Sequence, residues 1–329
     1  MKTILAFQGG GALGAFGAGA WDVLSTRRDV VDDLVAVAGA SIGAINAACV
    51  VKCLNDEDHG ASAILSLWQK RIATAPMPFL GTLPFKVVPS AASVNEWNGF
   101  MTGVFVGTTG LSRADWTRWQ PIAGMTRLHR PLHDRGRMIA MLREQFAPYH
   151  SAGSSMPLLA APAVDIMAGK ISLFDSDSAP ITDVHLAAST AIPLFYDPVE
   201  VDGRLHWDGE MTRESWLPAL CARLLQTGRI QPDEPLRLIT VEQFPQAIEA
   251  MPETGVELVY RLVSLLQLGK LQPPRLERIN IESCQRISRP PLPEDGVSGQ
   301  FDFSPSRIDR LIDEGRAAAR ACLEATATV

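Results

Sequence analysis

The 329-residue chain has few of the features that mark specialised classes of protein. It contains only five cysteines, an odd number, at Cys49, Cys53, Cys221, Cys284 and Cys322. Apart from Cys49 and Cys53, which stand four residues apart, they lack the spacing of metal ligands. We therefore interpret all five as reduced thiols and expect a cytoplasmic protein.

Long runs of one charge and long apolar runs are also absent. The 30 basic and 36 acidic residues give a net charge of −6, which argues against nucleic-acid binding. The first apolar run ends at Gln8, so a signal peptide is the weaker interpretation of the N-terminus. The uncharged stretch from Leu34 to Val51 includes two glycines, a serine and an asparagine, which is typical of a buried strand and helix rather than a membrane span.

What the chain does have is enough apolar sequence for a large core, since 47% of its residues are hydrophobic. Short apolar strands alternate with helices, which predicts an α/β fold with a mostly parallel central sheet buried on both faces, in one domain over residues 1–329. The predicted strands are 3–7, 34–38, 158–167, 171–174, 199–201, 204–207 and 236–241. The predicted helices are 12–24, 42–54, 134–146 and 182–191, with a C-terminal helix at about 305–325.

A glycine-rich segment, Gly9-Gly10-Gly11-Ala12-Leu13-Gly14, follows the first predicted strand. It satisfies the G-x-G-x-x-G pattern of dinucleotide-binding proteins. Those proteins place an acidic residue at the end of the second strand to hold the ribose, whereas this second strand ends at Ala38-Gly39-Ala40-Ser41. A dinucleotide-binding protein that uses Gly9 to Gly14 is therefore the less favoured alternative.

A second glycine cluster, Gly39-Ala40-Ser41-Ile42-Gly43, has the G-x-S-x-G pattern at a predicted strand-to-helix junction. A serine on such a turn projects its hydroxyl from the sheet, as a nucleophile must. Two parallel strands joined by one crossover place the first glycine cluster at the same sheet edge. Backbone N–H groups there would stabilise an oxyanion.

The base that would activate Ser41 is harder to assign. None of the six histidines lies in a sequence motif that indicates catalysis. Only His185 and His206 are kept as candidate general bases. Asp208, which follows the predicted strand 204–207, is a candidate to accept the proton directly. On spacing alone, a plain turn is the favoured interpretation of Asp208-Gly209.

Taken together and in order, these motifs resemble the patatin-like phospholipases. The resemblance extends to an A-S-x-A-x-P stretch at 188–193 and to an aspartate motif at Asp208-Gly209-Glu210. It implies a three-layer α/β/α fold and a Ser41–Asp208 dyad without histidine. It also implies an oxyanion hole of Gly9, Gly10 and Gly11, a nucleophile elbow flanked by Gly39 and Gly43, and no metal or cofactor.

The resemblance implies a serine lipid acyl hydrolase of the phospholipase A or lysophospholipase type. Such an enzyme cleaves carboxylic esters through an acyl-enzyme on Ser41, with Asp208 as general base. Glu210 stands where the family has a small residue, and its charge predicts a raised pKa for Asp208. The alternative that Glu210 motivates is a catalytically impaired relative that binds lipid or regulates.

The segment from about residue 75 to 131 differs from the rest by its many prolines, phenylalanines and tryptophans. We interpret it as an irregular insertion. It is either a lid that contacts acyl chains or a membrane surface, or a set of aromatics that pack a peripheral core. The expected partners are thus a lipid or other acyl ester and, through the lid, the periphery of a membrane.

Overall fold

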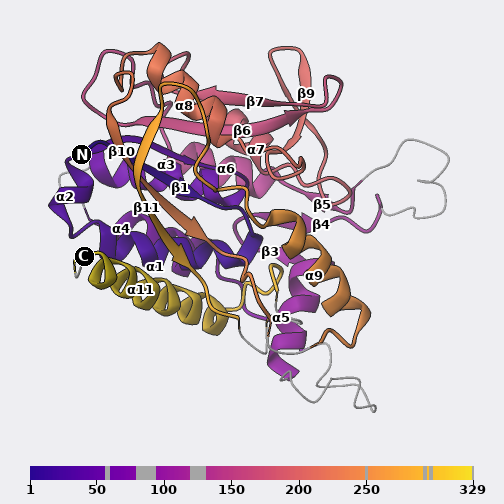
Figure 1. Ribbon diagram of the computed structural model, residues 1–329. Coiled ribbons are helices and arrows are strands. Elements are labelled where there is room, and N and C mark those ends of the chain that lie inside the picture. Colours follow the sequence, from indigo (N-terminus) through magenta and orange to yellow (C-terminus); the bar gives the residue numbers. More distant parts are fainter. Residues whose placement is uncertain are drawn as a thin grey trace.

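A mixed, mostly parallel sheet forms the centre of the computed structural model, which describes residues 1–55, 60–78, 94–118, 131–248, 251–291, 295 and 299–327 (Figure 1). Its eight strands follow the order β11-β10-β1-β2-β6-β9-β8, and β7 also pairs with β6. The strands are β1 (Thr3–Phe7), β2 (Leu34–Gly39), β6 (Leu158–Asp165), β7 (Lys170–Asp175), β8 (Val199–Val201), β9 (Arg204–Asp208), β10 (Pro235–Glu242) and β11 (Asn280–Ser288).

The strands from β11 to β6 are parallel, whereas β7, β9 and β8 are antiparallel additions. Every residue of β1 is buried, as expected for a parallel strand covered on both faces. β1 and β2 are neighbours, and their last residues, Phe7 and Gly39, lie opposite each other. The two glycine clusters therefore leave the same edge of the sheet.

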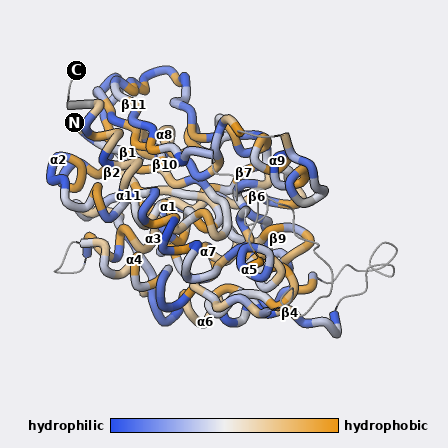
Figure 2. Tube along the Cα trace, turned by 90° about the horizontal axis from the view of Figure 1, so that it is seen from below, coloured by the Kyte–Doolittle hydropathy of each residue, from blue (hydrophilic) through white to orange (hydrophobic). Residues whose placement is uncertain are grey.

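Helices cover both faces of the sheet, which confirms the predicted fold class. Leu5 and Phe7 of β1 point toward α1, α3 and α11, which lie together in Figure 2, while Ile4 and Ala6 point toward α8. The helices are α1 (Gly14–Leu24), α2 (Arg28–Val31), α3 (Ile42–Asn55), α4 (Ser62–Ser66), α5 (Val94–Phe105), α6 (Gly136–Gln145), α7 (Asp183–Ser189), α8 (Leu217–Gln226), α9 (Gly255–Gln267) and α11 (Pro305–Ala327).

Small residues allow α1 and α11 to pack closely on one face of the sheet. A Cβ on Gly19 of α1 would collide with the backbone of Ile312, and a Cβ on Gly315 of α11 would collide with the backbone of Phe16. The last helix thus closes the core against the first one. A larger side chain at Gly19 or Gly315 would force the two helices apart.

The predicted insertion at 75–131 contains regular structure in its described part. It includes α5 and the strands β3 (Gly107–Thr108) and β4 (Ser112–Ala114), which form a small antiparallel sheet with β5 (His133–Asp134). Residues 79–93 and 119–130 of the insertion lie outside the described residues. The described part is therefore a helix and a small sheet, not a wholly irregular segment.

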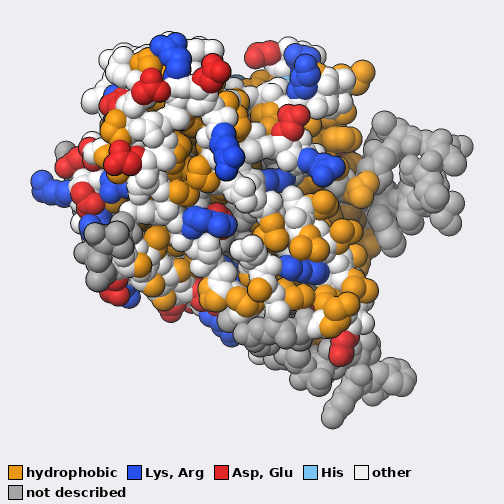
Figure 3. Space-filling model, in the orientation of Figure 1, with side chains coloured by type: hydrophobic (Ala, Val, Ile, Leu, Met, Phe, Trp, Pro, Cys, Tyr) orange, Lys and Arg blue, Asp and Glu red, His pale blue; other side chains and the backbone are white. Residues whose placement is uncertain are grey.

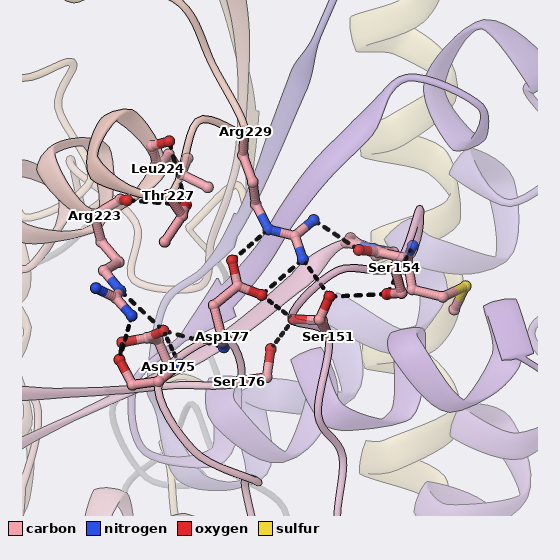
Figure 4. Close-up of polar contacts among 12 residues, drawn as sticks. Ser151, Ser154, Asp175, Ser176, Asp177, Arg223, Leu224, Thr227 and Arg229 are labelled. Carbon is pink, nitrogen blue, oxygen red and sulfur yellow. Dashed lines mark hydrogen bonds and ion pairs between the residues drawn. The ribbon is translucent and has the colours of Figure 1, made fainter.

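A partly buried ionic cluster joins the loops at the edge of the sheet opposite the glycine clusters (Figure 4). The Arg229 guanidinium donates to both carboxylate oxygens of Asp177, at 2.6 and 2.7 Å, and to the backbone oxygens of Ser151 and Met156. The Ser151 hydroxyl donates to Asp177 Oδ1. Burial alone would raise the pKa of Asp177, but the hydrogen bonds from Arg229 and Ser151 lower it overall.

Replacing Arg229 with Met is expected to lower the free energy of unfolding by about 2–3 kcal/mol, between the values for exposed and buried pairs, because Asp177 would stay partly buried without its partner. The deficit should shrink in acid, since protonation of Asp177 removes the uncompensated charge. Urea denaturation between pH 4 and pH 8 measures it. Arg27→Met breaks an exposed ion pair with Asp29 and should cost less than about 1 kcal/mol. Equal losses for the two variants would contradict the prediction.

Candidate active site

Ser41 occupies the tight turn between β2 and α3. Its φ of 56° lies in the left-handed region, which a residue with a Cβ rarely adopts. A Cβ on Gly39 would collide with the backbone of Gly43, and a Cβ on Gly43 would lie 2.6 Å from the Phe7 oxygen. Both flanking positions therefore require glycine. The turn has the strained geometry of a nucleophile elbow.

The segment from Ser189 to Ala191 connects the Ser41 turn with the end of β9. The backbone N–H of Ser41 donates to the carbonyl oxygen of Ser189 at 3.1 Å and lies 3.2 Å from its Oγ. The N–H of Gly209 donates to the same carbonyl, and that of Asp208 donates to Ala191 O at 2.9 Å. The A-S-x-A-x-P stretch thus brings Ser41 and Asp208 together.

Asp208 is buried at the end of β9. Its Oδ1 accepts a 2.8 Å hydrogen bond from the N–H of Glu210, while its Oδ2 is buried without a hydrogen bond of ordinary geometry. Burial raises the pKa of Asp208 to about 7, against the lowering effect of the Ser41 hydroxyl beside it. A carboxylate with this pKa is suited to proton transfer near neutral pH.

Glu210 links the glycine-rich segment to Asp208. Its Oε1 accepts a 2.9 Å hydrogen bond from the N–H of Gly9, and its Oε2 lies 3.1 Å from the Lys270 ammonium. Lys270 also donates to the Glu210 carbonyl oxygen. Both side chains are only 4% exposed, so each charge depends on the other for compensation.

The charges of this pair act on Asp208 in opposite directions. Glu210 raises the pKa of Asp208, as its sequence position predicts, but burial is the larger cause. Lys270 lowers the same pKa. No sequence signal pointed to Lys270, because it lies 60 residues beyond Glu210 and outside every recognised motif.

The three glycines of the predicted oxyanion hole differ in their hydrogen bonding. The amide of Gly9 is occupied by Glu210. Within the described chain, the amides of Gly10 and Gly11 donate no hydrogen bond. Gly11 has a φ of 57°, and a Cβ there would collide with the carbonyl of Gln300. The two free amides therefore belong to Gly10 and Gly11.

A mostly apolar pocket opens at Ser41 and Gly11. Part of its wall comes from the described insertion, through Gly103, Thr108, Leu111 and Ser112. The other lining residues are Ile42, Ile45, His133, Met138, Thr190, Ile192, Phe195, Tyr196, Gln300, Phe301 and Phe303. A second apolar pocket shares Phe195, Gln300 and Phe301 with the first and continues between α5 and α9.

The two histidines considered as candidate bases, His185 and His206, bind groups other than Ser41. His185 accepts the Thr182 N–H in the capping box of α7, and His206 contacts Ser172 Oγ and Arg204 O. The sequence did not single out His133, which lines the Ser41 pocket and contacts the Val104 carbonyl at 2.7 Å. Burial lowers the pKa of His133, so its ring is neutral at pH 7.

The cysteines and the helices add two further observations. The five cysteines, which all lie in the described part of the chain, form no disulfide. In the part of the chain that the structure describes, no group of three or more His, Cys, Asp or Glu side chains is placed to hold a metal ion. Among these same residues, no helix combines the length and the apolar character needed to cross a bilayer.

A mostly parallel sheet between two helical layers, with a serine elbow and a buried aspartate at one edge, defines a three-layer α/β protein with a hydrolase-like site. A sequence model of the family described as Patatin-like phospholipase matches residues 5–215, and the chain belongs to this family. Membership implies lipid acyl hydrolase activity.

Two solved structures are similar to this chain over part of their own length. VipD from Legionella pneumophila is 13% identical, with a TM-score of 0.44 over 98% of this chain and 67% of VipD. The type III effector protein ExoU is 13% identical, with a TM-score of 0.37 over 98% of this chain and 53% of ExoU. No curated protein matches the sequence.

Proposed function

We propose that this protein is a serine lipid acyl hydrolase of the phospholipase A or lysophospholipase type, with Ser41 as nucleophile and Asp208 as general base. The observation that carries the proposal is the position of the buried Asp208 carboxyl beside the Ser41 hydroxyl. Burial raises the pKa of this carboxyl to about 7. The strained backbone of Ser41 supports the same assignment, because strain of this kind is stored at functional turns.

In the proposed reaction, Asp208 Oδ2 accepts the hydroxyl proton as Ser41 Oγ forms a bond to the ester carbonyl carbon. The carbonyl oxygen becomes an oxyanion, which the free amides of Gly10 and Gly11 stabilise. Asp208 then gives the proton to the leaving alcohol as the ester bond breaks. Water hydrolyses the acyl-enzyme by the same steps, with Asp208 again accepting and returning a proton.

Gly9 has a different role in this proposal. Its amide is held by Glu210, so it orients the glycine-rich segment instead of binding the oxyanion. The apolar pocket beside Ser41 would hold the acyl chain, since its walls are mainly aliphatic and aromatic. The described part of the 75–131 insertion lines that pocket, which favours the lid interpretation over a purely peripheral core.

The two alternatives find less support in the site. A Cβ on Gly9 would lie 2.8 Å from both Ser41 Cβ and Glu210 Cγ, so the glycine segment faces the serine elbow closely. In a dinucleotide-binding protein, the pyrophosphate would need the space beside Gly9 that Ser41 and Glu210 fill here. The alternative of a catalytically impaired enzyme depends on the charge of Glu210, and Lys270 compensates that charge.

Labelling with an alkyl fluorophosphonate, followed by peptide mass spectrometry, tests the proposal. The adduct is expected on Ser41. Its rate should rise about tenfold per pH unit below pH 7 and level off above, because the base must be deprotonated to act.

The control is Asp208→Asn, which keeps the shape of the side chain and should form no adduct at any pH in this range. An unlabelled Ser41 in folded protein would refute the proposed nucleophile. Labelling that is unchanged in Asp208→Asn would refute the proposed base.

A further inference from the structure

Helix α9 presents an aliphatic side to solvent, while its side toward the protein includes buried polar residues. Five aliphatic residues, spaced to share one helical face, are between 49% and 62% exposed: Leu258, Val259, Leu262, Leu265 and Leu266. On the opposite side, Ser264 and Gln267 are buried. This is the reverse of the usual orientation of a surface helix. Figure 3 shows hydrophobic side chains gathered over this part of the surface, on the right of the view.

The charged residues of α9 do not interrupt this face. The Glu257 carboxylate accepts the amides of Glu253 and Thr254 in the N-terminal capping box. The Arg261 guanidinium donates to the backbone oxygens of Pro245 and Gln246. Both charges are thus held by backbone groups. In the segment before α9, Ile248 and Met251 are also exposed.

The exposed face adjoins the second apolar pocket through Val259. Val259, Tyr260 and Val263 of α9 line the second apolar pocket, which shares Phe195 and Phe301 with the pocket at Ser41. Apolar pocket walls therefore continue from α9 to the candidate nucleophile, and the side chains of Phe195 and Phe301 belong to both pockets. Movement of these two side chains would let an acyl chain pass from α9 to Ser41 within apolar surroundings.

We propose that the α9 face, defined as Leu258, Val259, Leu262, Leu265 and Leu266, docks this protein on a lipid surface and delivers lipid to the Ser41 pocket. Delivery of lipid to Ser41 rests on the proposed function, whereas docking on a lipid surface does not depend on it. At 13 residues, α9 is too short to span a bilayer and would lie in the plane of the interface. The face carries no exposed charge, so docking should be driven by aliphatic burial and should resist salt.

Flotation with phosphatidylcholine vesicles tests the docking step. The Ser41→Ala variant serves as the parent, so that lipid hydrolysis does not alter the vesicles. Leu262→Ser with Leu266→Ser should lower the partition coefficient by at least about tenfold, because each change removes buried methyl groups from the interface. Neither residue lines the Ser41 pocket or the second pocket. The matched control is a double serine substitution at the exposed Met167, in the turn between β6 and β7, and Leu205 of β9. These strands lie far from α9 in Figure 1, so the control should partition like the parent.

Activity separates docking from catalysis. In the Ser41 background, the Leu262 and Leu266 variant should hydrolyse vesicle lipid about tenfold more slowly, with unchanged kcat/KM for a soluble ester. A parent that does not partition, or a variant that partitions like it, would overturn the docking surface. So would a parent that elutes as a dimer and a variant that elutes as a monomer. If soluble esters are not cleaved but flotation behaves as expected, the proposed function fails and the docking surface stands.

Discussion

Replacing Asp208 with Asn is expected to lower kcat for a soluble ester such as p-nitrophenyl butyrate by about 10⁴-fold, with little change in KM. The amide keeps the size of the side chain and cannot accept the Ser41 proton. Ser41→Ala should lower kcat at least as far, and the double variant should be no worse than the worse single one, because the two residues act in one step. Steady-state kinetics at pH 8 measures all three.

Two histidine variants are the controls for this assignment. His185→Gln keeps an acceptor at the third position of the α7 capping box, and His206→Asn keeps a polar group beside Ser172. Both should retain kcat within about threefold, an allowance for small shifts of position around the site. A loss on the scale of Asp208→Asn in either would mean that a histidine, not the aspartate, is the base.

Replacing Lys270 with Met is expected to lower the free energy of unfolding by about 3–5 kcal/mol, since it leaves the Glu210 carboxylate buried without its partner. Adding Glu210→Gln should restore most of this stability, because the glutamine oxygen can still accept the Gly9 amide while the unpaired charge is gone. Urea denaturation of the two single variants and the double variant gives the coupling between the two sites.

The same variants should shift the pH dependence of activity in opposite directions. Lys270 lowers the pKa of Asp208, so its loss should move the activity profile to higher pH. Glu210 raises that pKa, so Glu210→Gln should move the profile to lower pH. A Lys270→Met protein with wild-type stability and an unshifted profile would show that the pair does not act on the site.

The sequence predicted the parts of the site that depend on local chain geometry. Residues Thr3–Phe7 and Leu34–Gly39 form the expected neighbouring strands, because uninterrupted apolar runs suit strands that are buried on both faces. The glycines around Ser41 were recognisable by their spacing, and they are required because a Cβ on Gly39 or Gly43 would collide with neighbouring backbone atoms.

Other elements were missed because their patterns depend on partners distant in sequence. β11 is an edge strand with alternating exposed polar residues, so its apolar signal is weak. α9 begins with a capping box at Thr254 and Glu257, which is a local signal for a helix start. Its outward apolar face could not be distinguished from a core-facing one by period alone.

The sequence by itself determined the α/β class and the two glycine turns at one sheet edge, since periodicity and glycine conformation are local properties. The tertiary structure alone decided which side chains surround those turns. Gly9 is held by Glu210, Glu210 is paired with Lys270, and Asp208 is buried deeply enough to raise its pKa. Burial and charge pairing depend on residues brought together from distant strands, so only the folded chain defines them.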